Sequence, residues 1–420
     1  MVSHSRLAAL GPAALAVAVS CQVVLGIEDK ELDPKLGSGG AAGSGGAPPD
    51  ASVGPKGSDA VPPARPDGDP VPKGGATRWF AAKTIFLGTH DPETKQPDKT
   101  AWKRIGHDID GECTTLEISK SNSSASCKQP SGASVDSLED GDDCRDNAAG
   151  RLVAVGTQVV SINFEPELHA GLLTAETATY ILRLDDLSGD ADDPYVRGAL
   201  YVSVPRNPQF EKPPSWDGAD QFAVDVLSVD APGPSDAGDS GAGDGDASDA
   251  SDASDAGNDG SAVEASAPSP FIDKPLFVFD KGYLSKNVWV SGELGKSPTR
   301  LPLFVFDRLT VVDTLSVTLA VELTPKHDQT VSSQLSAVVG TPELEKYFRP
   351  IALELVGCIP ALGGLLMDSY VLPARDLGAG PTLITPASPC DSQSLAFAFE
   401  WKPVKPPVTV ALGPQKPPKC

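Results

Sequence analysis

The clearest pattern along the chain is an alternation of apolar and polar positions in the second half. In two stretches, 315–323 and 395–401, every odd-numbered residue is apolar and the residues between are small or polar. This period of two predicts strands with one buried face. Weaker patterns of the same kind predict further strands at 79–87, 152–164, 179–184, 200–204, 221–229, 288–290 and 301–306.

The connections between these stretches are rich in Gly, Pro, Asn and Asp, with little helical periodicity between them. One helix is expected near Thr341, which can cap it, with Pro342 in the first turn; Pro350 should kink or end it, and Gly357 can terminate any continuation. The pattern as a whole predicts a mainly β fold, an antiparallel two-sheet sandwich of jelly-roll type.

Composition divides the chain into folded and unfolded parts. Gly (41) and Pro (40) are both frequent among the 420 residues. Gly, Ser, Pro and Ala dominate the end of segment 21–76, which predicts a flexible tether. Between Lys212 and Lys274 there are 14 acids and no base, so a disordered acidic insert is predicted at 231–270. The β domain is then formed by two halves, 77–230 and 271–420.

The amino terminus resembles an export signal. A basic Arg6 precedes an apolar stretch that is too short to span a membrane, which predicts a signal peptide over 1–20. The residues Ala18-Val19-Ser20-Cys21 resemble the bacterial lipobox, although Ala18 stands where Leu is preferred. The resemblance implies that Cys21 is lipidated (palmitate among its acyl chains), and Gln22 implies sorting to the outer membrane, on its periplasmic or cell-surface side. A buried cysteine after an ordinary signal peptide is the alternative.

If Cys21 carries lipid, six cysteines remain, three in each half of the domain. An exported protein meets an oxidising compartment, so these cysteines predict disulfides. Because three is odd, complete pairing within one molecule requires at least one bond between the halves, which makes them one domain. Two domains with a free thiol each, or a bridge between molecules, are the alternative. The six are Cys113, Cys127, Cys144, Cys358, Cys390 and Cys420.

Three acidic loops are candidate calcium sites, because calcium binds 6 to 8 oxygen ligands from flexible loops. None has EF-hand spacing, and the same Asp and Gly residues also suit ordinary turns. No other cofactor motif is found. The candidate ligands are Asp108, Asp110, Asp140, Asp142, Asp146, Asp190 and Asp192.

Two further stretches carry a resemblance. Residues 102–111 (WKRIGHDIDG), followed by Asp140-Gly141 and by 146–150 (DNAAG), resemble a pattern in uncharacterised secreted lipoproteins of myxobacterial type. The resemblance implies an extracytoplasmic β domain and attaches no activity to it. Residues 184–204 alone resemble concanavalin-type jelly rolls.

The charge balance, 34 Lys and Arg against 57 Asp and Glu, disfavours nucleic-acid binding. Two functions stay open. The first is a non-enzymatic, outer-membrane-anchored binding or structural module that contacts a surface protein or glycan. The second is an extracellular protein that binds or hydrolyses polysaccharide through loop-tip carboxylates, with or without calcium. In the second case one of five tryptophans would stack on a sugar, although tryptophans on strands more often lie in the core.

Overall fold

The computed structural model describes residues 60–120, 126–128, 139–160, 164–209, 211–231, 269–296, 299–305, 308–378, 383–413 and 420. The predicted signal peptide, Cys21, most of the predicted tether and nearly all of the predicted acidic insert lie outside these residues. In the described part, the last portion of the predicted tether lies against the domain. Ala60 is buried, and the Tyr283 hydroxyl donates to the carbonyl oxygen of Pro63.

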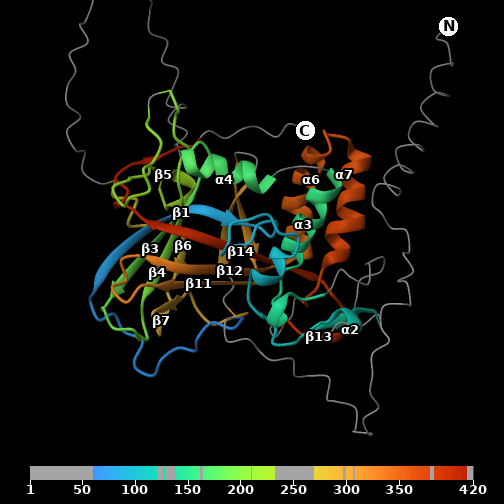
Figure 1. Cartoon of the computed structure of the whole chain (residues 1–420), viewed down its shortest axis with the longest axis horizontal. Helices are drawn as coiled ribbons and strands as arrows, with labels where there is room; N and C mark the ends of the chain where they lie inside the picture. Colours follow the sequence, from blue (N-terminus) through green and yellow to red (C-terminus); the bar gives the residue numbers. More distant parts are fainter. Residues whose placement is uncertain are drawn as a thin grey trace, which may run out of the picture.

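The domain is built on one antiparallel sheet of nine strands, in the order β6-β4-β3-β1-β14-β12-β11-β8-β7 (Figure 1). Its strands are β1 (Ala76–Phe86), β3 (Tyr180–Leu187), β4 (Arg197–Val202), β6 (Phe277–Phe279), β7 (Tyr283–Ser285), β8 (Val288–Val290), β11 (Ser316–Leu323), β12 (Thr330–Gly340) and β14 (Ser392–Pro403). A hairpin, β9 (Thr299–Val305) with β10 (Arg308–Thr314), forms a second small sheet. The mainly β, antiparallel fold is confirmed.

Both halves of the sequence contribute to this sheet. The strand β1 pairs with β3 on one side and with β14 on the other, so the first and last long strands of the domain are neighbours. Two short parallel pairs also join the halves: β2 (Cys127–Lys128) with β13 (Thr385–Pro389), and β5 (Val224–Asp225) with β15 (Val410–Ala411). One domain therefore forms from both halves, as the cysteine count required.

The sheet is curled, and its two ends approach each other. Phe279 on β6 and Trp289 on β8 have ring centroids 5.9 Å apart, although six other strands separate β6 from β8 in the sheet order. Residues of the loop before β4 also form a bridge with β7, between Asp193 and Leu284. The sequence predicted a sandwich of two sheets, whereas the structure has one curled sheet of nine strands around the core.

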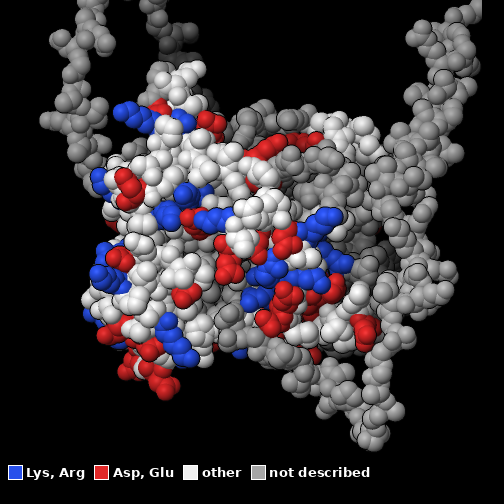
Figure 2. Space-filling model, in the orientation of Figure 1, with Lys and Arg blue, Asp and Glu red and all other residues white. Residues whose placement is uncertain are grey.

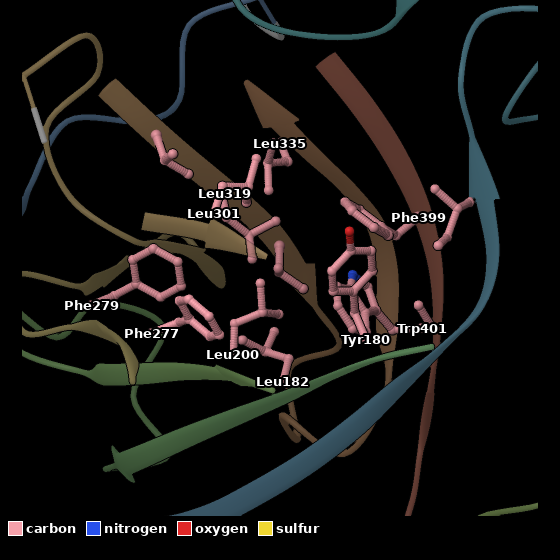
Figure 3. Close-up of a cluster of buried hydrophobic side chains, with 14 of the residues drawn as sticks. Tyr180, Leu182, Leu200, Phe277, Phe279, Leu301, Leu319, Leu335, Phe399 and Trp401 are labelled. Atoms are coloured by element: carbon pink, nitrogen blue, oxygen red, sulfur yellow. The ribbon is translucent and has the colours of Figure 1, made fainter. Parts of the chain in front are cut away.

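The core lies inside this curl. Figure 3 shows side chains from β3, β4, β6, β9, β11, β12 and β14 converging there, among them Tyr180, Leu319 and Phe399. The Tyr180 hydroxyl donates to the carbonyl oxygen of Pro302 at 2.8 Å, which ties β3 to the β9–β10 hairpin. Trp79, Trp102, Trp289 and Trp401 are all buried. The expectation that strand tryptophans lie in the core holds for Trp79, Trp289 and Trp401, whereas Trp102 belongs to a 3₁₀ turn, 101–104.

The helices of the described residues are α2 (Leu116–Lys120), α3 (Ala148–Val160), α4 (Phe164–Thr174), α5 (Thr341–Glu343), α6 (Arg349–Leu355) and α7 (Pro360–Leu366). Figure 1 shows α4 beside β1, the helices α3, α6 and α7 grouped together, and α2 next to β13; Leu172 of α4 belongs to the apolar core, and Val153 of α3 packs against it. Short 3₁₀ turns form η2 (Ala101–Arg104), η3 (Asp142–Cys144), η4 (Val226–Ser228) and η7 (Leu372–Ala374), and π-helical turns form η5 (Leu344–Phe348) and η6 (Met367–Val371).

Two strand predictions were wrong. Segment 152–164 is helical in α3 and at the start of α4, because Asn147 caps the helix: its Oδ1 accepts the Gly150 N–H at 2.9 Å. This cap and the packing on β14 outweigh the β preference of the valines. Of the predicted strand 221–229, only β5 is a strand.

The helix expected near Thr341 is present, but its N-cap is Gly340. Gly357 (φ +68°) follows the end of α6 as expected.

Acidic and basic side chains are mixed on the face shown in Figure 2. Several form ion pairs, including Lys103 with Glu139 at 2.7 Å and Arg104 with Asp91 at 2.6 Å. Exposed pairs of this kind add little stability each. Acidic and basic side chains therefore form local ion pairs on this domain, although the chain as a whole is strongly negative.

Candidate functional site

Two of the three predicted acidic loops meet in the structure. Asp108 and Asp110 lie in the loop that follows η2, and Asp146 lies between η3 and α3. One carboxylate oxygen from each of the three lies within 4.8 Å of the others. Asp108 and Asp146 are each 2% exposed, and Asp110 is half-buried. Three oxygen ligands therefore converge at a buried position.

Backbone amides hold these carboxylates in place. Asp146 Oδ2 accepts the Ile109 N–H at 2.5 Å, which connects the two loops directly. Asp108 Oδ1 accepts the N–H of Gly111 at 2.7 Å, a turn that needs the positive φ of Gly111 (+80°). The Ser126 hydroxyl donates to Asp110. These bonds leave the carboxylates close together without using all of their acceptor capacity.

Two more acids complete the group, which we call the acidic cluster: Asp108, Asp110, Asp140, Asp146 and Asp376. Asp140 Oδ2 accepts the Thr114 N–H at 2.5 Å. Asp376 is 6% exposed and accepts the Ser394 N–H at 2.8 Å. Asp140, Asp146 and Asp376 each repel other members of the cluster.

Burial dominates the electrostatics of the acidic cluster. It raises the pKa of Asp376 to about 7, although Ser394 opposes the shift with two hydrogen bonds. It raises the pKa of Asp110 to about 6, with repulsion from Asp108 adding to the effect. Burial first, and then the neighbouring carboxylates, raise the pKa values of Asp140 and Asp146 well above the ordinary range. Without a bound cation, the carboxyl groups of the cluster therefore keep their protons to a higher pH than exposed aspartates do.

Two disulfides flank the acidic cluster. Cys113 bonds to Cys144, which joins the loop that carries Asp110 to the loop that carries Asp146. Cys127 bonds to Cys390 across 263 residues and so joins the two halves, as the odd cysteine counts predicted. Cys127 Sγ also lies 3.1 Å from the carbonyl oxygen of Asp376. The loops that carry Asp110 and Asp146 are therefore joined covalently, whereas Asp376 is held by non-covalent contacts.

The third disulfide lies in the helical region. Cys358, between α6 and α7, bonds to Cys420, the last residue of the chain. All six cysteines named in the sequence analysis are therefore paired within one molecule.

The remaining sequence-predicted ligands do not join the acidic cluster. Asp142 is exposed in η3. Asp190 and Asp192 are exposed in the loop after β3, where Asp192 Oδ1 accepts the Lys286 N–H at 2.8 Å. Asp192 therefore joins this loop to the β7–β8 hairpin, and neither acid contributes to the acidic cluster.

Asp376 is the member that sequence reasoning missed. It stands alone in sequence, 230 positions after Asp146, and no spacing rule connects the two. Its place follows from β14: Ser394 on that strand binds Asp376, and Ser394 Oγ also accepts the Ala148 N–H at 2.8 Å. Strand pairing brings these residues together, which a local pattern cannot reveal.

The histidines take other positions. His107, next to Asp108, is 2% exposed with Nδ1 2.8 Å from the Ser336 hydroxyl, and burial lowers its pKa to about 3. His90 and His169 lie 3.7 and 3.8 Å from the buried Oε1 of Glu165. His169 Nε2 is directed at the Ile85 carbonyl at 2.7 Å and His90 Nδ1 at Thr89 Oγ1 at 3.1 Å. These contacts occupy the imidazole nitrogens nearest to Glu165.

Comparison of the chain with protein-family models, with curated proteins and with solved structures finds no match. In the part of the chain that the structure describes, no helix combines the length and apolar character needed to cross a membrane. The functional argument therefore depends on the residues of the acidic cluster and on the sequence of the amino terminus.

Proposed function

We propose that the chain is an exported, lipid-anchored protein whose β domain is a binding or structural module, and that the acidic cluster binds calcium. The observation that carries the calcium assignment is the convergence of Asp108, Asp110 and Asp146, whose ligand oxygens lie within 4.8 Å of one another in a buried position. Asp140 and Asp376 supply further carboxylates next to these three.

Charge balance supports a cation at this place. Five carboxyl groups share one region, and gathering buried charges of the same sign is costly. The nearby buried base, Arg145, directs its Nη1 to the Gly106 carbonyl at 2.6 Å and to Gln334. One guanidinium cannot balance five carboxylates. A divalent cation would remove the repulsion and allow the carboxylates to ionise at neutral pH.

The ligand chemistry selects calcium among the common metals. The converging donors are carboxylate oxygens, which suit calcium and magnesium; zinc and copper prefer imidazole and thiolate. The cysteines beside the cluster are consumed in disulfides, and His107 is bound to Ser336. Magnesium requires a near-ideal octahedral arrangement, whereas calcium accepts irregular sets from flexible loops.

The position of the acidic cluster favours a structural role for the cation over glycoside hydrolysis. A glycosidase needs two carboxyl groups facing a groove that holds a sugar, with room for water in some cases. Asp108 and Asp146 are 2% exposed, and four of the five tryptophans are buried. The hollow at the edge of the cluster, bordered by Asp140 and Thr114, encloses about 170 Å³, below the usual range of ligand pockets.

The amino terminus supports export and anchoring. Cys21 follows Ala18-Val19-Ser20 after a short apolar stretch, and six further cysteines are oxidised in the folded domain. Disulfides form outside the cytosol, where calcium is also more plentiful. We propose that the lipid holds the domain at the outer membrane, where it contacts a surface protein or glycan.

Calorimetric unfolding tests the calcium assignment. Protein stripped with EGTA is melted with and without millimolar CaCl₂, and the melting temperature is expected to rise by roughly 5 °C or more, because calcium binds the native state preferentially. Asp110→Asn and Asp146→Asn should each remove most of this shift.

Asp190→Asn is the matched control, because Asp190 is an exposed acid outside the acidic cluster, and it should leave the shift unchanged. The assignment fails if the wild-type melting temperature does not respond to calcium, or if magnesium at the same concentration produces an equal shift.

A further inference from the structure

A second hollow lies where the start of β1, the end of β3 and the β11–β12 turn meet. It encloses about 290 Å³, and its lining includes Arg78, Lys326, His327, Ser188 and Gly189. We call it the basic hollow. Its volume is at the lower end of the range for small-molecule sites, enough for one small ligand and too small for a polymer chain.

The basic residues of this hollow are available to a ligand. Neither Arg78 nor Lys326 has an ion-pair partner among the described residues, and both side chains are exposed. Arg78 and Lys326 therefore bring two positive charges to one hollow in a chain whose net charge is −23.

The third basic residue is fixed in position. His327 is 2% exposed, and its Nε2 lies 3.2 Å from Asn287 Oδ1. Its backbone has φ +53°, a left-handed conformation that is unfavourable for a residue with a Cβ and that occurs often at ligand sites. Burial first, and then Arg78, lower the pKa of this imidazole, so His327 borders the hollow as a neutral hydrogen-bonding group and not as a third positive charge.

The backbone around the basic hollow departs from regular pairing on both sides. The β1–β3 register shifts between Ala76 and Arg78, and the β11–β12 register shifts between Glu322 and Leu323. Such bulges redirect side chains and are common beside functional sites. Gly75 allows the chain to pass close to β3, since a Cβ there would lie 2.1 Å from the Leu187 carbonyl oxygen.

None of the described residues that line the hollow is acidic. Asp190 and Asp328 both favour protonation of His327, so they are in its neighbourhood. Asp328 Oδ1, however, accepts the Thr324 hydroxyl at 2.8 Å, and neither acid lines the hollow. The lining itself therefore has a positive character.

We propose that the basic hollow binds a small oxyanion, a phosphate or carboxylate group carried by a ligand no larger than a single sugar unit. Arg78 would contact it through the guanidinium fork, which matches the two oxygens of such a group, and Lys326 would add a second positive charge. This site is separate from the acidic cluster and does not depend on calcium.

Isothermal titration of the calcium-free protein at low salt tests the proposal. Inorganic phosphate and D-glucuronate are the two probes, and they distinguish a phosphate-bearing from a carboxylate-bearing ligand. D-glucose, which resembles glucuronate without the charge, should not bind. Arg78→Gln and Lys326→Gln should each raise the dissociation constant of the anion roughly tenfold, the loss expected for one charged hydrogen bond. The double variant should show no binding.

Lys99→Gln serves as the matched control, because Lys99 is an exposed base outside the hollow; this variant should bind as the wild type does. The proposal is overturned if neither anion binds up to about 20 mM, or if the double variant binds as tightly as Lys99→Gln. Circular dichroism of each variant confirms that the fold is intact before titration.

Discussion

The indole Nε1 of Trp289 donates a hydrogen bond to the carbonyl oxygen of Val196 at 2.9 Å. Trp289 lies on β8, near one end of the strand order, and Val196 immediately precedes β4, near the other end. The side chain is fully buried and fills the space between the two ends of the curled sheet. This contact therefore closes the β layer around its core.

Gly198 on β4 is essential for this closure. A Cβ at this position would lie 2.2 Å from the Trp289 ring, closer than real Cβ contacts. Gly198→Ala is therefore expected to lower the free energy of unfolding by roughly 3 kcal/mol or more, through overpacking. Chemical denaturation measures the change.

Gly156, in α3, is the matched control. It has open space around its Cβ position, so Gly156→Ala should leave the stability unchanged or raise it by about 0.5–1 kcal/mol. Equal effects of the two substitutions would contradict the closure of the sheet by Trp289.

The acidic cluster predicts an unusual pH dependence for the calcium-free protein. Asp376 has an ordinary pKa of 3.8 and a folded-state pKa of about 7, so the folded chain holds this proton more tightly than the unfolded chain. The resulting stabilisation is complete at low pH and is lost as the pH rises toward 7. In EGTA, stability should fall by roughly 2–4 kcal/mol between pH 5 and pH 7.5.

Calcium should reverse this trend, because it favours the ionised carboxylates. Denaturant melts at the two pH values, with EGTA or with calcium, measure the effect. Asp376→Asn should flatten the EGTA profile in particular. A calcium-free protein that is equally stable at pH 5 and pH 7.5 would contradict the raised pKa of Asp376 in the folded chain.

The Cys127–Cys390 bond predicts that the domain survives a cut in the acidic insert. This segment contains many Asp residues and no Lys or Arg, so an aspartate-specific protease, and not trypsin, is the suitable reagent. Under non-reducing conditions the two fragments should migrate together, and reduction should separate them.

The double variant Cys127→Ser/Cys390→Ser tests the contribution of this bond. Its fragments should separate in denaturant without reduction, since neither of the other two disulfides joins the halves. The intact variant should lose up to about 5 kcal/mol of stability, because the bond closes a very long loop. If the wild-type fragments separate without reduction, the pairing is wrong.

Replacement of Cys21 by Ser tests the anchor. The wild-type protein is expected in the membrane fraction, and Cys21→Ser in the soluble extracytoplasmic fraction, because the acyl chains supply the membrane affinity. Metabolic labelling with palmitate should mark the wild type only. A Cys21→Ser protein that stays in the membrane fraction would contradict the lipid anchor.

Strand periodicity predicted much of this fold. Segments 315–323 and 395–401 correspond to β11 and to part of β14. These predictions succeeded because a strict alternation of apolar and polar residues indicates a strand with one buried face. Segment 152–164 failed because its valines favour a strand locally, while the cap supplied by Asn147 and packing on β14 favour a helix. Local preference is a weak guide where tertiary contacts decide.

The acidic cluster was predictable to the extent that its loops carry recognisable acids. Asp108, Asp110, Asp140 and Asp146 stand in turn-forming sequences that are close along the chain. Asp376 lies far from these four acids in sequence. Its position in the cluster depends on the long-range pairing of β14 with β1 and β12. The basic hollow was equally hidden, because Arg78 and Lys326 are 248 positions apart in sequence.

The disulfide connectivity has a consequence for maturation. The bonds are 113–144, 127–390 and 358–420, so no cysteine is joined to the next one along the chain. If the chain is exported as proposed, an oxidant that coupled thiols in their order of emergence would form three incorrect bonds. Native pairing would then require either oxidation delayed until Cys420 has crossed the membrane or later reshuffling by an isomerase.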